Sequence, residues 1–149
     1  MGDRESIFIL MADDDEDDCQ FTKNAFIENR LLNEIRFVKD GEELMDYLHR
    51  RGKFADVATS PRPDLILLDL NMPKLDGRAA LKAIKSDPGL RAIPVVILTT
   101  SEEDEDILRS YENGASSYIP KPVTIEGMVE ITKKIGFYWF DIVRLPPRK

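Results

Sequence analysis

Short runs of consecutive apolar residues alternate along this chain with longer stretches in which apolar residues recur every three or four positions. The runs lie at Ser6–Ala12, Glu34–Val38, Leu65–Leu68, Ile93–Thr99 and, most weakly, Ser117–Pro120. A short apolar run bounded by turn-forming residues is typical of a strand buried on both faces in a parallel sheet. The pattern therefore predicts five strands, with the four consecutive aliphatic residues Leu65–Leu68 forming a central one.

The stretches between the runs predict helices. Each places apolar side chains at helical spacing: Phe21, Ala25 and Phe26 before about Arg30; Leu44, Met45 and Leu48 after Asp40–Gly41; Ala80, Leu81 and Ile84 before Asp87–Gly89; Ile107, Leu108 and Tyr111 after a start at Ser101; and Ile125, Met128, Val129, Ile135, Trp139 and Ile142, facing inward, after Thr124. Because strand and helix alternate five times, we predict a doubly wound α/β fold with helices on both faces of a parallel sheet.

The length and charge of the chain restrict its class. With 149 residues we expect one domain, residues 1–149, with one sizeable core. The net charge of −7 argues against a nucleic-acid surface, which requires a basic stripe. The single cysteine, Cys19, cannot form an internal disulfide, and no apolar segment approaches membrane-spanning length. We therefore expect a cytoplasmic protein that binds neither nucleic acid nor membrane.

Polar residues follow four of the five predicted strands. Asp13 and Asp14 follow the first strand, Asp69 the third and Lys121 the fifth, while Thr99 ends the fourth. The carboxyl ends of parallel strands lie at one edge of a sheet, which is where ligands bind in open α/β folds. We therefore expect these side chains to meet. Taken alone, Asp69 could simply cap the turn into Met72–Pro73, and Asp15–Asp18 could be a solvated helix start.

Several carboxylates at one edge repel one another unless a cation lies among them. Oxygen ligands without histidine or cysteine favour Mg²⁺ over zinc. Lys121 adds a point charge suited to a phosphoryl oxygen, and Thr99 adds a hydroxyl donor. Such a set predicts an aspartyl-phosphate site at Asp69, in which catalysis consists mainly of positioning and charge neutralisation.

These motifs together resemble the receiver domain of two-component response regulators. The resemblance rests on Asp13–Asp14, Asp69–Pro73 with Asp76–Gly77, Thr99–Thr100 and Lys121–Pro122. It covers nearly the whole chain and implies a flavodoxin-like (CheY-like) fold. It also implies a phosphorelay protein whose phosphoacceptor, Asp69, receives a phosphoryl group from the phosphohistidine of a histidine kinase.

The resemblance assigns a role to each site residue. It makes Asp14 and Asp69 direct Mg²⁺ ligands, Asp13 a ligand through water, Asn71 a ligand through its backbone carbonyl, Lys121 the partner of a phosphoryl oxygen, and Thr99 with Tyr118 the switch pair. It also implies a cis bond between Lys121 and Pro122. Asp15 adds a further carboxylate, which leaves open which acids bind the metal. Pro120 cannot donate a ladder hydrogen bond, which indicates an edge strand or an early strand end.

Two segments make the resemblance more specific, because they are similar to one group within the family. The long loop Arg50–Pro63 and the aromatic tail from Gly136 are similar to the stand-alone response regulators of bacterial phytochrome histidine kinases. Phe137 or Phe140 in this tail is expected to be exposed for a partner, or else to cover the edge of the core. The implied partners are a sensor histidine kinase, which could be of the phytochrome type, or a phosphotransfer protein, and an unidentified downstream protein. A homodimer is left open.

Two other functions compete with this one. A receiver-like scaffold would bind partners without phosphorylation, but it has no need of the full set Asp14, Asp69, Thr99 and Lys121. A phosphatase of the haloacid-dehalogenase type also uses an aspartate nucleophile with Mg²⁺, but it has a second aspartate two residues later, where this chain has Asn71. We therefore expect no enzymatic activity beyond self-phosphorylation from small donors and autodephosphorylation. Only Val143–Lys149 follow the last helix, so no output domain is expected.

Overall fold

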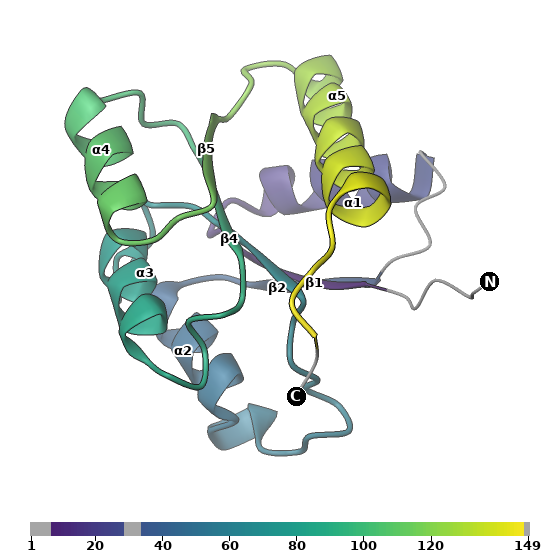
Figure 1. The fold of residues 1–149 in the computed structure, drawn as a ribbon. Coiled ribbons are helices and arrows are strands. Elements are labelled where there is room, and N and C mark those ends of the chain that lie inside the picture. The colour runs from purple at the N-terminus through teal and green to yellow at the C-terminus, as the bar shows by residue number, and fades with distance from the viewer. Residues whose placement is uncertain (1–6, 29–33, 148–149) are drawn as a thin grey trace.

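The computed structural model describes residues 7–28 and 34–147, and its core is a five-stranded sheet (Figure 1). The strands are β1 Phe8–Ala12, β2 Glu34–Val38, β3 Leu65–Leu68, β4 Val95–Thr99 and β5 Ser117–Pro120. They pair in the order β2-β1-β3-β4-β5, and every pairing is parallel. This arrangement confirms the predicted doubly wound sheet and places β5 at an edge, where Pro120 ends it.

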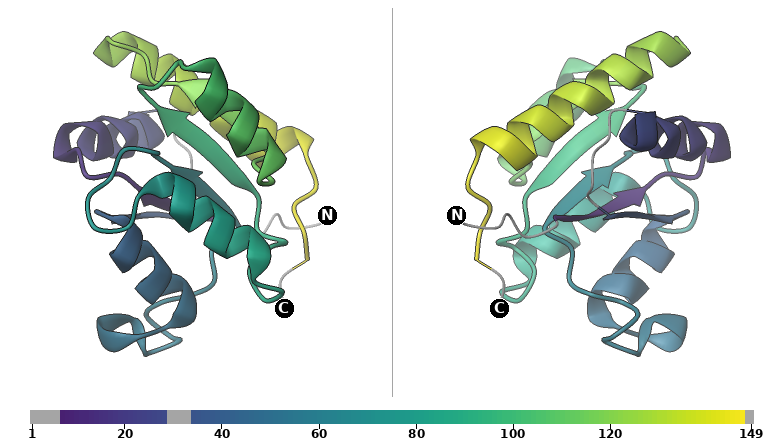
Figure 2. Two further views of the ribbon diagram at one scale, coloured as in Figure 1. Left: turned by 90° about the vertical axis from the view of Figure 1, so that its left-hand side faces the viewer. Right: turned by 90° about the vertical axis from the view of Figure 1, so that its right-hand side faces the viewer.

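Helices cover both faces of the sheet, as Figures 1 and 2 show. They are α1 Glu16–Glu28, α2 Gly41–His49, α3 Gly77–Ser86, α4 Asp104–Glu112 and α5 Ile125–Gly136. Because side chains alternate along a strand, Ile9 and Met11 pack with α1 and α5, whereas Leu10 packs with α2 and α3 on the other face. Of the predicted strand Ser6–Ala12, Phe8–Ala12 forms β1 and Ile7 precedes it, while Ser6 and residues 29–33 lie outside the described residues.

The start predicted for the fourth helix is wrong. It begins at Asp104 rather than at Ser101, because the Ser101 hydroxyl donates to Asp106 Oδ2 instead of capping the helix. Leu108 and Tyr111 share a face, as predicted, and that face is exposed.

The inward positions predicted for the last helix are only partly right. Met128 and Ile135 are buried, whereas Ile125 and Ile142 are each 55% exposed. The helical path continues from α5 through a π-helical segment, Phe137–Ile142. At about 1.5 Å per residue this path is about 27 Å long, whereas five strand residues span only about 17 Å, so its ends extend past the sheet. In the aromatic tail, Phe140 is buried and Phe137 is exposed.

Candidate functional site

Four strands deliver the predicted site residues to one edge of the sheet. The register pairs Ala12 with Leu68 and Thr99 with Pro120, so the residues that follow these strands lie side by side. Backbone hydrogen bonds extend the pairing past the strand ends: Asp69 N–H donates to Ala12 O at 3.0 Å, and Lys121 N–H donates to Thr99 O at 2.7 Å. The sheet itself therefore positions the site.

Three carboxylates converge at this edge. One oxygen from each of Asp13, Asp14 and Asp69 lies within 4.8 Å of the other two. Asp13 and Asp69 are buried, whereas Asp14 is exposed and leaves the cluster open to solvent. Three hard oxygen donors at this spacing fit a divalent cation such as Mg²⁺. Asp15 instead caps α1, because its Oδ1 accepts hydrogen bonds from Asp17 N–H at 2.9 Å and from Asp18 N–H at 3.3 Å.

Lys121 lies among the carboxylates. Its Nζ is 2.7 Å from Asp13 Oδ2, 2.8 Å from Asp18 Oδ2 and 3.1 Å from Asp69 Oδ2, and its side chain is only 5% exposed. Sequence reasoning missed Asp18, which it treated as a solvated residue at a helix start. The available signal was its place in the first turn of α1, the helix that leads directly away from the acidic edge.

Burial and charge shift the pKa values of this group. Burial raises the pKa of Asp13 to about 6, although the Lys121 ammonium and the Asp15 N–H oppose the shift. Burial lowers the pKa of Lys121, but its bonds to Asp13 and Asp18 and the charge of Asp69 outweigh that effect, so the pKa lies above its usual value. Lys121 is thus a permanent ammonium at neutral pH. One ammonium faces several carboxylates, which leaves the edge electrostatically short of positive charge.

The two predicted switch residues lie in different environments. Thr99 is completely buried, and its Oγ1 has no hydrogen-bond partner among the described residues. A buried hydroxyl without a partner costs about 1–3 kcal/mol, so an acceptor that reaches it would be stabilised. The Tyr118 hydroxyl donates to the Ser101 carbonyl at 2.9 Å, and its ring packs against the α2 and α3 side of the core. Burial raises the pKa of Tyr118.

The loop after β3 holds Asp69 in place. Asn71 N–H donates to Asp69 Oδ1 at 3.3 Å, and Gly77 N–H donates to Leu70 O at 2.9 Å. The second bond brings the start of α3 against the backbone of Asp69. The cis bond expected between Lys121 and Pro122 is wrong: every described peptide bond is trans. Proline makes the cis form accessible without requiring it, so residue type alone could not decide the isomer.

A network that the sequence did not reveal links this loop to α4. Arg78 binds Asp106 with two parallel hydrogen bonds of 2.7 Å, and its Nη1 also donates to Asn71 Oδ1 at 3.3 Å. The Ser101 hydroxyl donates to the same Asp106 carboxylate at 2.7 Å, and Ser101 O accepts from Tyr118. A continuous path of hydrogen bonds therefore runs from Asn71, in the loop after β3, to Tyr118 in β5. It passes through Arg78, Asp106 and Ser101.

Asp106 should make the stability of the fold depend on acidic pH. Hydrogen bonds from Arg78 and Ser101 lower its pKa from 3.8 to about 2. Since the folded-state pKa lies below the unfolded value, the stabilisation is present above about pH 4 and is lost as the pH falls towards 2. We expect Asp106→Asn to lower the free energy of unfolding at pH 7 by about 1 kcal/mol, a figure reduced because Arg78 is partly solvated.

The matched control is Asp104→Asn, in the same first turn of α4 but exposed. Urea unfolding at pH 7 and pH 3 measures both variants. Both lose the same interaction with the helix dipole, so the deficit of Asp106→Asn should exceed that of Asp104→Asn at pH 7, and the difference between the two deficits should shrink at pH 3. Equal deficits at both pH values would contradict the assignment.

The fold and the acidic edge define a receiver domain, and the chain belongs to that family: the response regulator receiver domain matches residues 9–133. The chain is thus a response regulator of two-component signalling. It is 36% identical over 138 residues to the response regulator Rcp1 of Synechocystis sp. (strain ATCC 27184 / PCC 6803 / Kazusa), a match that covers 93% of this chain and 92% of that protein.

Solved structures of response regulators are similar to this chain over nearly its whole length. The phosphorylated cyanobacterial phytochrome response regulator RcpA is 39% identical, with a TM-score of 0.90 over 96% of this chain and 100% of that one. The Mn²⁺-bound form of Rcp1 is 35% identical, with a TM-score of 0.87 over 95% of this chain and 99% of that one. Within the described residues, no helix has the length and apolar character needed to cross a bilayer.

Proposed function

We propose that this chain is a cytoplasmic single-domain response regulator, residues 1–149, that accepts a phosphoryl group on Asp69. The observation that carries the proposal is the setting of that carboxylate. It is buried among two other acids within 4.8 Å, and its Oδ2 lies 3.1 Å from the Lys121 ammonium. Such a carboxylate can act as a nucleophile towards phosphorus, because the Lys121 ammonium, together with a divalent cation when one is bound, would neutralise the charge that transfer brings in.

In the proposed transfer, an Asp69 oxygen attacks the phosphorus of a phosphohistidine. The new P–O bond forms as the P–N bond breaks, and the imidazole nitrogen keeps the electron pair of that bond. Lys121 then pairs with a phosphoryl oxygen in place of Asp69 Oδ2. The unpaired Thr99 hydroxyl donates to another phosphoryl oxygen, which removes the cost of its buried, unbonded state.

The metal assigned to this site is Mg²⁺, held by Asp14 and Asp69 directly, by Asp13 through water and by the backbone carbonyl of Asn71. Asp13, Asp14 and Asp69 supply only hard oxygen donors, which favour Mg²⁺. When bound, the ion supplies charge neutralisation at the phosphoryl group. Asp15 is left out of this set because its carboxylate caps α1.

The output is a protein-binding face formed by α4, β5 and α5. Thr99 and Tyr118 are the switch pair, and Tyr118 is bonded to the loop that leads into α4. Exposed apolar side chains on these elements and on the connection to α5 offer a docking surface: Leu108, Tyr111, Val123 and Ile125. A downstream protein or a second copy would bind there. Similarity to RcpA, a cyanobacterial phytochrome response regulator, supports a phytochrome-type histidine kinase as phosphoryl donor.

The competing functions fit the site less well. A phosphatase needs a general acid at the position of Asn71, but an amide does not supply a proton at neutral pH, and its oxygen is already bonded to Arg78. A scaffold without phosphorylation would leave the buried, unbonded Thr99 hydroxyl without a purpose.

Intact mass spectrometry tests the proposal. We expect the protein, incubated with a small acyl-phosphate donor and Mg²⁺, to gain the mass of one phosphoryl group, and peptide mapping to place it on Asp69. Removal of divalent cations should abolish the gain, and adding Mg²⁺ back should restore it. An unmodified mass under all conditions, while a known receiver domain is modified in parallel, would refute phosphorylation and favour the scaffold.

A further inference from the structure

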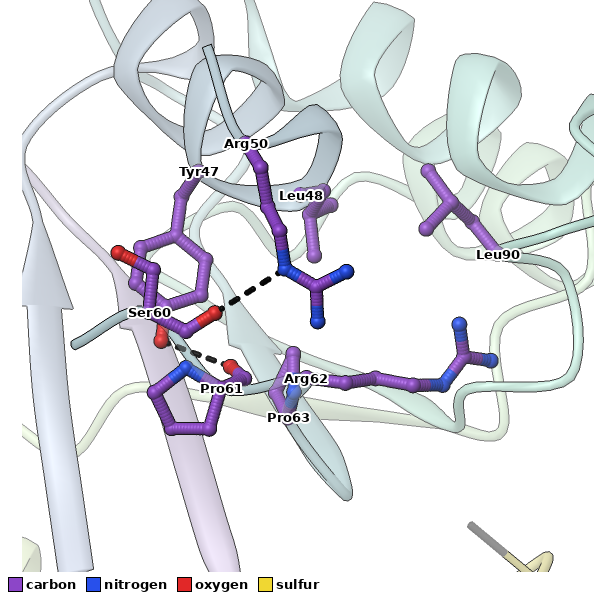
Figure 3. Close-up of a pocket in the computed structure, with 8 residues that line it drawn as sticks. All are labelled: Tyr47, Leu48, Arg50, Ser60, Pro61, Arg62, Pro63 and Leu90. Atoms are coloured by element: carbon purple, nitrogen blue, oxygen red, sulfur yellow. Dashed lines mark hydrogen bonds between the residues drawn. The ribbon is translucent and has the colours of Figure 1, made fainter. Parts of the chain in front are cut away.

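A small cavity lies beyond the amino-terminal ends of the strands, at the opposite end of the sheet from the acidic site. It holds about 130 Å³ and is bordered by the end of α2, by the loop that precedes β3 and by the turn that follows α3 (Figure 3). Its walls include Tyr47, Arg50, Ser60, Pro61, Arg62 and Leu90. The long loop Arg50–Pro63 therefore builds a cavity that the phosphorelay function does not use.

Two arginines border this cavity without a counter-charge. In the part of the chain that the structure describes, the side chains of Arg36, Arg51, Arg78 and Arg109 form ion pairs with carboxylates. Those of Arg50, Arg62, Arg91 and Arg144 do not, and of these four only Arg50 and Arg62 line the cavity. Figure 3 shows both unpaired guanidinium groups facing one open space below Leu48 and Leu90. In a chain with a net charge of −7, two unpaired cations at one cavity are a local excess of positive charge.

Backbone carbonyls hold the two guanidinium groups in place. Arg50 Nε donates to Ser60 O at 3.4 Å, and Arg62 Nη1 donates to Gly89 O at 2.6 Å. Each guanidinium has five N–H donors, so most of them are left for a ligand. Planar, fixed donors of this kind match the oxygens of a phosphate group, often in pairs.

The backbone of Arg50 is itself unusual. It ends α2 in the left-handed conformation, with φ 54° and ψ 52°. This conformation costs a residue with a β-carbon about 1–2 kcal/mol and is the position at which helices usually place glycine. Glycine would end the helix at a lower conformational free energy, whereas arginine adds a guanidinium group at the cavity.

The remaining walls are fixed before any ligand arrives. The Tyr47 side chain is buried, its hydroxyl donates to Pro61 O at 2.8 Å, and its ring centroid lies 5.0 Å from that of Phe54. Ser60 is also buried. A cavity with fixed walls loses little conformational entropy when it binds.

We propose that this cavity binds a phosphate group, as the free ion or as a phosphomonoester. The volume of the cavity is below the range of about 300–1,000 Å³ that drug-sized ligands need. It equals the volume of about four waters, so only a small group such as phosphate can enter. Two positive charges match a group that carries about −1.5 to −2 at neutral pH. Phosphate binding at this cavity would not require Asp69, since the cavity and the acidic site lie at opposite ends of the strands.

Nuclear magnetic resonance of the ¹⁵N-labelled full chain tests the site in buffer freed of divalent cations, at constant ionic strength. Titration with inorganic phosphate is expected to shift the amides of Arg50, Ser60 and Arg62 saturably, whereas acetate at the same concentrations shifts them weakly. Phenyl phosphate, titrated in parallel, distinguishes the sources: tighter binding than inorganic phosphate identifies a phosphomonoester, and weaker binding identifies the free ion.

Three variants distinguish the loss of this binding site from a general loss of positive charge and from a loss of stability. Arg62→Gln and Arg50→Gly should each weaken phosphate binding about tenfold or more, because each removes charge-assisted hydrogen bonds. Arg50→Gly should unfold at the same temperature as the wild type or higher, since it relieves the left-handed backbone. Arg91→Gln, an exposed neighbour outside the cavity, removes the same charge and should bind as the wild type does. Equal weakening in all three variants, unsaturable shifts, or acetate binding as tight as phosphate would overturn the proposal.

Discussion

Asp69→Asn is expected to abolish phosphorylation of this protein. Asparagine has nearly the same shape as aspartate, but its amide is not a nucleophile towards phosphorus. Intact mass spectrometry after incubation with an acyl-phosphate donor and Mg²⁺ should show no phosphoryl adduct. We expect the variant to fold, because the substitution removes one negative charge from a crowded acidic edge and Lys121 keeps its partners Asp13 and Asp18.

Asp15→Asn is the matched control for Asp69→Asn. It changes the same chemical group in the same acidic region, but the Asp15 carboxylate only caps α1. Asparagine caps helices as well as aspartate does, so stability should be unchanged and the adduct should form as in the wild type. An adduct that persists in Asp69→Asn would move the phosphoacceptor to Asp13 or Asp14, and loss of the adduct in Asp15→Asn would place that residue in the reaction.

Gly77→Ala is expected to lower the free energy of unfolding by about 2–4 kcal/mol. A β-carbon on Gly77 would lie 2.1 Å from the backbone oxygen of Asp69 and 2.7 Å from Leu70 Cα. These are backbone atoms of the chain directly after β3, so the clash can be relieved only if α3 moves away from the sheet. That movement would break the bond from Gly77 N–H to Leu70 O and displace Asp69.

Urea unfolding followed by Trp139 fluorescence measures the loss, and Gly89→Ala is its control. A β-carbon on Gly89 would approach only the Asp87 side chain, at 3.3 Å, and a shift of a few tenths of an ångström in that side chain relieves the contact. We expect a change within about 0.5 kcal/mol for this exposed glycine. Phosphorylation of Gly77→Ala should also be slower than that of Gly89→Ala. If the two variants were equally stable, close packing of α3 against Asp69 would not be what requires glycine at position 77.

The meeting of several site residues could be predicted from their positions in the sequence. Asp13, Asp69 and Lys121 each follow a strand directly, so a parallel sheet brings them together whatever their side chains do. Asp18 and Asp106 could not be found in the same way. Each is one of several acids at a helix start, and its partner, Lys121 or Arg78, is distant in sequence.

The apolar runs and their alternation with helical repeats determined the five-stranded sheet, because a strand of consecutive aliphatic residues must be covered on both faces and the intervening helices supply that cover. The order of the acidic and basic residues along those runs determined which of them meet at the carboxyl edge. Only the tertiary structure decided that Asp15 caps α1 while Asp18 binds Lys121, that the Thr99 hydroxyl lacks a partner among the described residues, and that Arg50 and Arg62 face one cavity. Those outcomes depend on side-chain rotamers and on the path of a long loop, which short-range sequence patterns do not specify.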